Sequence, residues 1–195
     1  MAESNITKPD KDQLRLHLTV LRAQAGDEKA FAGLLGEYGV RTLAYARSLV
    51  GDTDADDVQQ ETWLAVYRNL RQLHDPAAFE MWLFRTTRHR AFNWLRRFRR
   101  ERELLDDVPL EQVPADQAED EVAMAFDTPA FSAAVAGLPP PQREALLLRY
   151  RDDLSYAQIA LVVGCPIGTV RARLHYAKKS LQTILSPEQD DARTA

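Results

Sequence analysis

A single acidic stretch divides this chain of 195 residues and limits what it can fold into. Residues 103–130, ELLDDVPLEQVPADQAEDEVAMAFDTPA, contain nine acidic residues, no basic residue and three prolines, with weak periodicity in their apolar residues. Such a composition is typical of a linker rather than of a packed domain. The formal net charge of −4 hides this division, because residues 1–102 sum to +3 and residues 131–185 to +4. We therefore expect two small basic domains joined by an acidic flexible linker.

On both sides of the linker the apolar residues recur with the spacing of amphipathic helices, and no segment shows sustained period-two alternation. The sequence therefore predicts an all-α protein. Glycine–aspartate pairs and prolines mark the breaks between helices, since glycine and proline interrupt a helix and aspartate caps one. The predicted helices are 11–25, 27–50, 54–73 and 77–101 before the linker and 129–137, 140–151, 155–163 and 168–185 after it.

These helices define the expected domain organisation. The first domain covers residues 11–102 and the second covers residues 129–185. The linker is residues 103–128, in which a short helix is expected at 118–126. Tails of 1–10 and 186–195 complete the chain.

The composition argues against several classes of protein. No apolar run approaches the roughly 18 residues that a membrane-spanning helix needs, and the N-terminus lacks the pattern of a signal peptide. Cys165 is the only cysteine, which excludes an internal disulfide framework and fits a reducing cytoplasm. Nothing near Cys165 is arranged to activate its thiol. One cysteine and four scattered histidines also argue against a zinc site, so we expect neither metal nor cofactor.

Residues 155–181, SYAQIALVVGCPIGTVRARLHYAKKSL, predict a helix, a short glycine-containing turn and a second helix. This is the layout of a helix-turn-helix, whose second helix enters the major groove of DNA. Helical spacing groups Val170, Leu174, Ala177 and Leu181 on one inward side. The opposite side carries a basic set: Arg171, Ala172, His175, Lys178, Lys179 and Gln182. Thr169 lies near the start of the second helix, where it could donate a hydrogen bond to a DNA phosphate. The alternative to a DNA-binding role for this side of the helix is an ordinary basic face exposed to solvent.

Residues 79–102, FEMWLFRTTRHRAFNWLRRFRRER, contain eight arginines interleaved with aromatic residues. On a helical wheel one basic row forms what we call the arginine stripe: Arg85, Arg88, His89, Arg96, Arg99 and Arg100. Such a row can follow a phosphate backbone, and nearby aromatics can stack on unpaired bases. Trp82, Phe84 and Trp94 fall outside the stripe and are expected in the core.

Residues 52–61, DTDADDVQQE, invite a calcium-loop interpretation that fails. Counting from Asp52, the glycine required at position six is Asp57 and the glutamate required at position twelve is Trp63. A metal-dependent nuclease is equally disfavoured, because the acids lack a partner constellation. The helical wheel instead separates a buried side from an exposed one, which carries Asp57, Gln60, Glu61, Leu64, Arg68 and Arg71. We call the first five of these residues the acidic face. An apolar Leu64 among charges suggests contact with a protein.

Three segments together resemble an extracytoplasmic-function (ECF) sigma factor of the sigma-70 family: DADDVQQETWLAVYRNL, FEMWLFRTTRHRAFNWLRR and LPPPQREALLLRYRDDLSYAQIALVVGCPIGTVRARLHYAKKSL. Such proteins are small bacterial initiation factors with only sigma regions two and four. The resemblance covers about residues 20–185, in the family's order and with its linker. It implies a factor that binds core RNA polymerase and directs promoter recognition, DNA melting and transcription initiation.

The resemblance also implies a role for each surface. The acidic face would dock on the clamp helices of the largest polymerase subunit, and the linker would thread toward the polymerase active site. The arginine stripe would hold the melted non-template strand after a loop captures a flipped base of the minus-ten element. That loop, called loop 74–78 below, consists of His74, Asp75, Pro76, Ala77 and Ala78. The minus-thirty-five duplex would meet Thr169, Arg171, Ala172, Arg173, His175, Lys178 and Lys179.

Two positions depart from the family pattern. His89 stands where asparagine is frequent and Ala172 where serine is frequent, which leaves the promoter sequence open but not the class. Many relatives are held inactive by a membrane-bound anti-sigma factor, so such a partner is expected here. We expect no enzymatic activity and no stable homo-oligomer. The alternative function is a stand-alone helix-turn-helix transcriptional regulator, although no heptad or symmetric interface supports the dimer that such proteins usually form.

Overall fold

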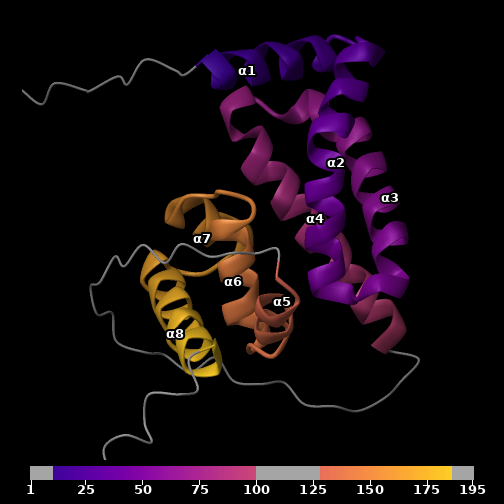
Figure 1. The fold of residues 1–195 in the computed structure, drawn as a ribbon. Helices are drawn as coiled ribbons and strands as arrows, with labels where there is room; N and C mark the ends of the chain where they lie inside the picture. The colour runs from indigo at the N-terminus through magenta and orange to yellow at the C-terminus, as the bar shows by residue number, and fades with distance from the viewer. Residues whose placement is uncertain (1–10, 100–127, 186–195) are drawn as a thin grey trace, which may run out of the picture. The chain divides into compact units, whose positions relative to one another are not determined.

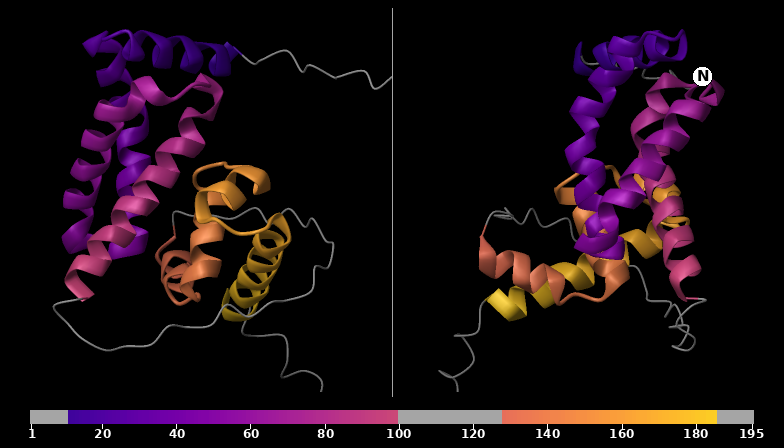
Figure 2. Two further views of the ribbon diagram at one scale, coloured as in Figure 1. Left: turned by 180° about the vertical axis from the view of Figure 1, so that it is seen from behind. Right: turned by 90° about the vertical axis from the view of Figure 1, so that its right-hand side faces the viewer.

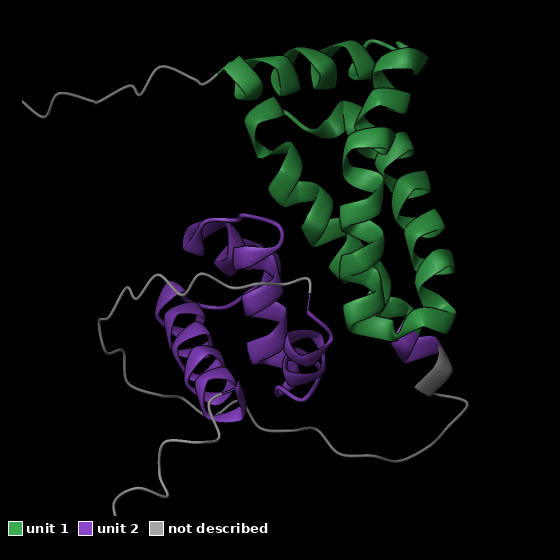
Figure 3. Cartoon of the chain, in the orientation of Figure 1, with its two compact units in different colours: residues 1–94 green, residues 95–195 purple. Residues whose placement is uncertain are grey.

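The computed structural model describes residues 11–99 and 128–185, and every regular element in those two ranges is helical (Figure 1). The chain divides into two compact units, residues 1–94 and residues 95–195 (Figure 3). This confirms the all-α prediction with two helical domains. The linker and the helix predicted at 118–126 lie outside the described residues.

Within residues 11–94, unit 1 contains three helices, two short 3₁₀ turns and most of a fourth helix. These elements are α1 (Lys11–Gln24), α2 (Glu28–Val50), α3 (Asp52–Asn69), η1 (Leu70–Gln72), η2 (Pro76–Ala78) and α4 (Phe79–Arg99). The third predicted helix was too long, because α3 ends at Asn69 and its continuation tightens into η1, as helix ends often do. The fourth was predicted to begin too early, because Pro76 starts η2 before α4 begins at Phe79.

Side chains from all four helices of unit 1 form its core. One buried cluster consists of Val20, Leu34, Tyr38, Trp63, Val66, Leu70, Phe79 and Leu83. Tyr38 meets Phe79 edge to face at 5.5 Å between ring centroids, and Tyr45 meets Phe84 in the same way at 5.5 Å. Such aromatic pairs add about 0.5–1.5 kcal/mol beyond their buried area. The helix α1 lies across one end of α2, α3 and α4, where it contacts α2, η1 and η2 (Figure 2).

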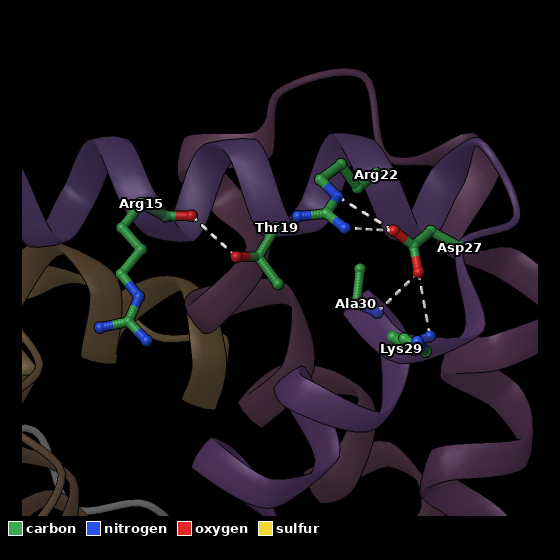
Figure 4. Close-up of polar contacts among 6 residues, drawn as sticks. All are labelled: Arg15, Thr19, Arg22, Asp27, Lys29 and Ala30. Atoms are coloured by element: carbon green, nitrogen blue, oxygen red, sulfur yellow. Dashed lines mark hydrogen bonds and ion pairs between the residues drawn. The ribbon is translucent and has the colours of Figure 1, made fainter.

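The turn from α1 to α2 is set by two residues. Gly26 adopts a φ of +96°, which a side chain would disfavour, and the N–H groups of Gly26 and Asp27 donate to the carbonyls of Ala23 and Arg22. Asp27 then caps α2 by accepting from the N–H groups of Lys29 and Ala30, and it pairs with Arg22 at 2.6 Å (Figure 4). The N–H of Ala30 and the Arg22 guanidinium hold the pKa of the Asp27 carboxyl below its usual value.

Over residues 128–185, unit 2 contains four helices whose bounds match the predictions to within one residue. They are α5 (Pro129–Ala136), α6 (Pro140–Tyr150), α7 (Tyr156–Val163) and α8 (Ile167–Leu185). The last of them packs against the other three, and Leu146, Leu148, Leu154, Ile159 and Leu174 are almost fully buried. Ser155 and Gln158 form a reciprocal capping box at the start of α7.

Across residues 11–99 and 128–185, none of the helices has both the length and the apolar character needed to cross a bilayer. The same residues bring together no group of three or more His, Cys, Asp or Glu side chains able to hold a metal ion.

Candidate nucleic-acid interface

The turn before α8 fixes the orientation of the helix-turn-helix. Gly164 adopts a left-handed conformation with φ 73°, and its N–H and that of Cys165 both donate to the carbonyl of Ala160. This conformation favours glycine and closes α7, so α8 begins within three residues at Ile167. Cys165 itself is partly buried. The sequence GCPI therefore determines where the second helix starts.

The predicted inward side of α8 is confirmed, since Val170, Leu174, Ala177 and Leu181 are all buried. Of the predicted DNA-facing residues, Arg171, His175 and Lys179 are exposed, whereas Thr169, Arg173 and Lys178 are partly buried. The Lys178 ammonium lies 5.4 Å from the ring centroid of Tyr150 on α6. A cation over an aromatic face is attracted to the ring, which holds the Lys178 side chain against α6.

One residue of this set is not where the sequence suggested. Ala172 was expected on the exposed side of α8, but only 9% of its surface is accessible. A helical wheel treats α8 as an isolated helix, whereas α5, α6 and α7 all pack against it and cover part of its surface. Among the predicted DNA-facing residues, the exposed side chains of α8 are therefore Arg171, His175 and Lys179.

The arginine stripe lies on α4, and most of its described members are exposed. Arg85, His89 and Arg96 are exposed, whereas Arg88 is partly buried. The Arg88 guanidinium lies 4.4 Å from the ring centroid of Phe92, which is itself 38% exposed. The Arg99 side chain and the whole of Arg100 lie outside the described residues.

The aromatic residues assigned to the core of α4 divide by degree of burial. Phe84 is fully buried. Trp82 is partly buried against the core cluster that contains Phe79, and Trp94 packs beside the cluster of Ala46, Ala55, Val58 and Ala91. Phe92 is thus the accessible aromatic ring among the described side chains of α4, and it lies beside a cation of the stripe.

Loop 74–78 joins η1 to α4 through η2. The Asp75 carboxylate accepts from the N–H of Ala77 at 2.9 Å, and the Ala78 N–H donates to the Asp75 carbonyl at 3.0 Å. His74, Asp75 and Ala77 are exposed, whereas Pro76 and Ala78 are partly buried. The loop is therefore an ordered turn with three accessible residues.

Long-range contacts that no sequence pattern had indicated hold this part of unit 1. The Gln24 side chain on α1 donates to the carbonyls of Leu70 and Leu73, just before loop 74–78. Arg41 on α2 pairs with Glu80 on α4 at 2.8 Å and lies over the rings of Tyr38 and Phe84. Burial raises the pKa of the Tyr38 hydroxyl, and the nearby Glu80 and Glu37 carboxylates add to this.

The acidic face of α3 has the predicted geometry. Asp57, Gln60 and Arg68 are exposed, Glu61 is partly buried, and Leu64 is 48% exposed. Sequence reasoning missed Tyr67, which is 63% exposed and meets Phe31 edge to face at 5.2 Å between ring centroids. Its position three residues after Leu64 was the available signal, because residues so spaced are neighbours on a helix.

Two family models match the chain. Sigma-70 region 2 matches residues 34–101, and Sigma-70, region 4 matches residues 130–181. The first match contains the acidic face, loop 74–78 and the arginine stripe up to Arg100. The second contains the helix-turn-helix.

Individual relatives extend the likeness over nearly the whole chain. The ECF RNA polymerase sigma-E factor of Haemophilus influenzae is 31% identical over 191 residues, which cover 90% of this chain and 98% of that protein. Its counterpart in Escherichia coli is 30% identical, with coverage of 90% and 97%.

Solved structures share the fold. The sigma factor RpoE of Bartonella quintana, determined in complex with the anti-sigma factor NepR, superposes with a TM-score of 0.64 at 26% identity over 83% of this chain and 99% of that one. CnrH, determined with the cytosolic domain of CnrY, has the same fold with a TM-score of 0.61 at 23% identity, covering 89% of this chain and 99% of that one. Together with the sequence relatives, these matches show that the chain belongs to the ECF sigma factors of the sigma-70 family, a family of transcription initiation factors rather than of enzymes.

Proposed function

We propose that this sigma factor uses three surfaces in transcription initiation and acts only when bound to core RNA polymerase. The acidic face binds the polymerase, loop 74–78 and the arginine stripe bind melted DNA, and α8 binds duplex DNA. The observation that carries the proposal is that the chain has two helices with exposed basic side chains. One is α4, in the segment that matches sigma region 2, and the other is α8, in the segment that matches sigma region 4. Neither unit is strongly basic as a whole, so each alone binds DNA weakly. The polymerase supplies the spacing that lets both bind together, and tethered sites gain affinity in this way.

The acidic face of α3 docks on the clamp helices of the polymerase. Leu64 supplies an apolar contact within a rim formed by Asp57, Gln60, Glu61 and Arg68. Tyr67 extends the apolar contact by one helical turn. An apolar centre surrounded by polar groups is the common anatomy of a protein interface.

Loop 74–78 and the arginine stripe act on melted DNA. Unstacking a base costs on the order of a few kcal/mol, and stacking on an aromatic side chain returns about 1–3 kcal/mol per base. Phe92 and the Arg88 guanidinium present flat surfaces on α4, while Arg85, His89 and Arg96 face the strand backbone. Binding energy for the open strand thereby offsets the cost of opening it.

The helix α8 reads the minus-thirty-five element as duplex. Arginine can donate two hydrogen bonds to one guanine, whereas lysine mostly contacts phosphate. Arg171 and Arg173 are therefore assigned to bases, and Lys178 and Lys179 to the backbone. His175 lies between them on the exposed side, and Thr169 lies within the first turn.

Further expectations follow from membership of the family. The factor works in the cytoplasm, where the polymerase is, and an anti-sigma factor holds it inactive; the RpoE structure, which was determined in complex with the anti-sigma factor NepR, supports such a partner. It carries out no catalysis and needs no cofactor. The functional domains extend over 11–102 and 129–185, with the acidic linker between them threaded into the polymerase.

Run-off transcription with purified core polymerase tests the proposal. We expect the factor to start transcripts from the promoter upstream of its own gene, and we expect the isolated chain to bind that DNA weakly at physiological salt. A stand-alone regulator would do the reverse: it would bind the DNA tightly by itself and leave bare polymerase silent.

A matched pair of variants tests the acidic face. Leu64→Glu places a charge in the proposed contact, whereas Leu21→Glu places one at an equally accessible leucine of α1, with exposures of 48% and 49%. We expect the affinity for core polymerase to fall at least tenfold, roughly 1.4 kcal/mol, for Leu64→Glu alone. Equal affinities for the two variants would remove α3 from the interface.

A further inference from the structure

We infer that Gln24, on the first helix, is a positioning residue for the capture of the flipped minus-ten base by loop 74–78. The inference rests on the proposed function of that loop. The hydrogen bonds of the Gln24 side chain go to Leu70 and Leu73, which precede the loop. Gln24 therefore acts through η1, the 3₁₀ turn that leads into the loop.

The Gln24 carboxamide makes two hydrogen bonds to one short segment. Its Nε2 atom donates to the carbonyl of Leu70 at 2.8 Å and to the carbonyl of Leu73 at 2.7 Å, across 46 and 49 residues of sequence. A carboxamide nitrogen carries two hydrogens, so both donors of Gln24 are used. The Leu73 N–H also donates to the Leu70 carbonyl at 3.1 Å, which closes η1. Gln24 thus fixes both ends of η1, and Leu73 directly precedes His74.

The contact is reciprocated, because the Arg71 Nε donates to the backbone carbonyl of Gln24 at 3.2 Å. That carbonyl is one of the last four of α1, which have no partner within their own helix. Gly26 ends α1 two residues later with φ +96°, and a side chain at this position would strain the turn. The end of α1 and η1 therefore hold each other in one arrangement.

Loop 74–78 lies between two fixed points. On one side Leu73 is held by Gln24 and packs on the main core cluster, and on the other side Phe79 is fully buried. His74, Asp75 and Ala77 remain exposed between them. A loop already held in its binding conformation loses less entropy when it takes a ligand, so it binds more tightly. Gln24 supplies this preorganisation from behind the exposed side chains.

The test compares Gln24→Met with the control Gln13→Met. Methionine keeps an unbranched side chain of similar length but has no N–H donor, and Gln13 is an exposed residue of the same helix. The probe is a single-stranded oligonucleotide with the non-template sequence of the promoter upstream of this factor's own gene. A second series of probes carries an abasic site at each position in turn. Holoenzyme affinity is measured for every probe.

We expect one abasic position to weaken binding of the wild-type holoenzyme by about tenfold or more, as for the loss of one captured base. Gln24→Met should bind the intact probe about fivefold to tenfold more weakly, and its penalty at that abasic position should shrink to about twofold. Gln13→Met should match the wild type throughout. Core affinity should stay constant, which separates loop positioning from a general loss of structure.

The outcomes separate the inference from the function on which it rests. A wild-type holoenzyme that tolerates every abasic site would remove base capture from loop 74–78. If the abasic site weakens binding of the wild-type and the Gln24→Met holoenzymes by the same factor, Gln24 has no role in base capture. If Gln24→Met does not fold, Gln24→Asn takes its place, because it keeps the amide but withdraws it by one carbon atom. An undiminished penalty in that variant overturns the inference equally.

Discussion

The proposed DNA-binding parts of the two units are built in different ways. In unit 2 the proposed interface is one side of α8, which packs against α5, α6 and α7. In unit 1 part of the proposed interface is loop 74–78, and the chain leading into it is held by a side chain 46 residues earlier, that of Gln24. A helix presents its surface through its own periodicity, whereas a loop needs partners from elsewhere in the fold. Changes in the core, the surface and the caps should therefore affect the two units differently.

The largest effect is expected for Phe84→Ala in unit 1. Removing a buried phenylalanine should cost about 3–5 kcal/mol of the free energy of unfolding, because Phe84 is fully buried and packs on Tyr45. All three tryptophans, Trp63, Trp82 and Trp94, belong to unit 1, so tryptophan emission during denaturation reports on this unit. The unfolding midpoint reported by amide NMR signals from residues 128–185 should stay at its wild-type value. If the midpoints from tryptophan emission and from these amide signals both shifted, the two units would unfold as one.

The next effect concerns base recognition by α8. Arg171→Ala should weaken holoenzyme binding to a minus-thirty-five duplex by about 1–3 kcal/mol and only for the cognate sequence. Lys179→Ala should weaken binding to every sequence alike and lower the slope of affinity against salt by about one. Titrations of both variants at several salt concentrations measure this. Identical behaviour of the two would mean that α8 contacts only the backbone.

A smaller effect is expected from the cap of α7. Ser155→Ala removes the acceptor for the Gln158 N–H and should cost about 1 kcal/mol in unit 2. Hydrogen exchange of the amides of α7 and α8 measures the loss, while tryptophan emission from unit 1 should not change. Ser132→Ala, at an exposed position within α5, is the control. Equal protection in both variants would argue against a stabilising cap.

The smallest effect depends on pH. Because the folded state lowers the pKa of Asp27, its carboxylate stabilises unit 1 above the usual value of 3.8, and this contribution disappears as the pH falls through the lower folded value. Asp27→Asn cannot titrate, so its unfolding midpoint should change less than that of the wild type between pH 5 and about pH 2.5. The tryptophan emission midpoint measures this difference. Parallel curves would mean that Asp27 titrates normally in the folded protein.

The sequence predicted what repeats along a helix. It identified the inward residues of α8, the accessible Leu64 of α3 and the basic row of α4, because each depends on a periodicity of 3.6 residues. It failed for Ala172, since a helical wheel gives the direction of a side chain but not which other helices pack against that part of the helix. The ion pair of Arg41 with Glu80 and the hydrogen bonds of Gln24 depend on tertiary folding, which no local pattern contains.

The end of loop 74–78 was also misjudged for a local reason. The proline at position 76 was expected to precede a continuous helix from residue 77, whereas the chain makes η2 first and begins α4 at Phe79. The Asp75 carboxylate favours this turn by accepting from the Ala77 N–H. Aspartate before proline is a turn signal as well as a helix-start signal, and here the turn comes first.

The position of Gln24 has a practical consequence for anyone who trims this protein. The match to Sigma-70 region 2 begins at residue 34, so a fragment cut to that boundary would omit α1 entirely. Such a fragment would keep the acidic face and every residue of loop 74–78. It would nevertheless leave the Leu73 carbonyl without its amide donor and the Arg71 side chain without its acceptor. Boundaries drawn from sequence likeness alone would thus give a piece that lacks Val20 of the core cluster as well as the contacts that hold the chain leading into loop 74–78.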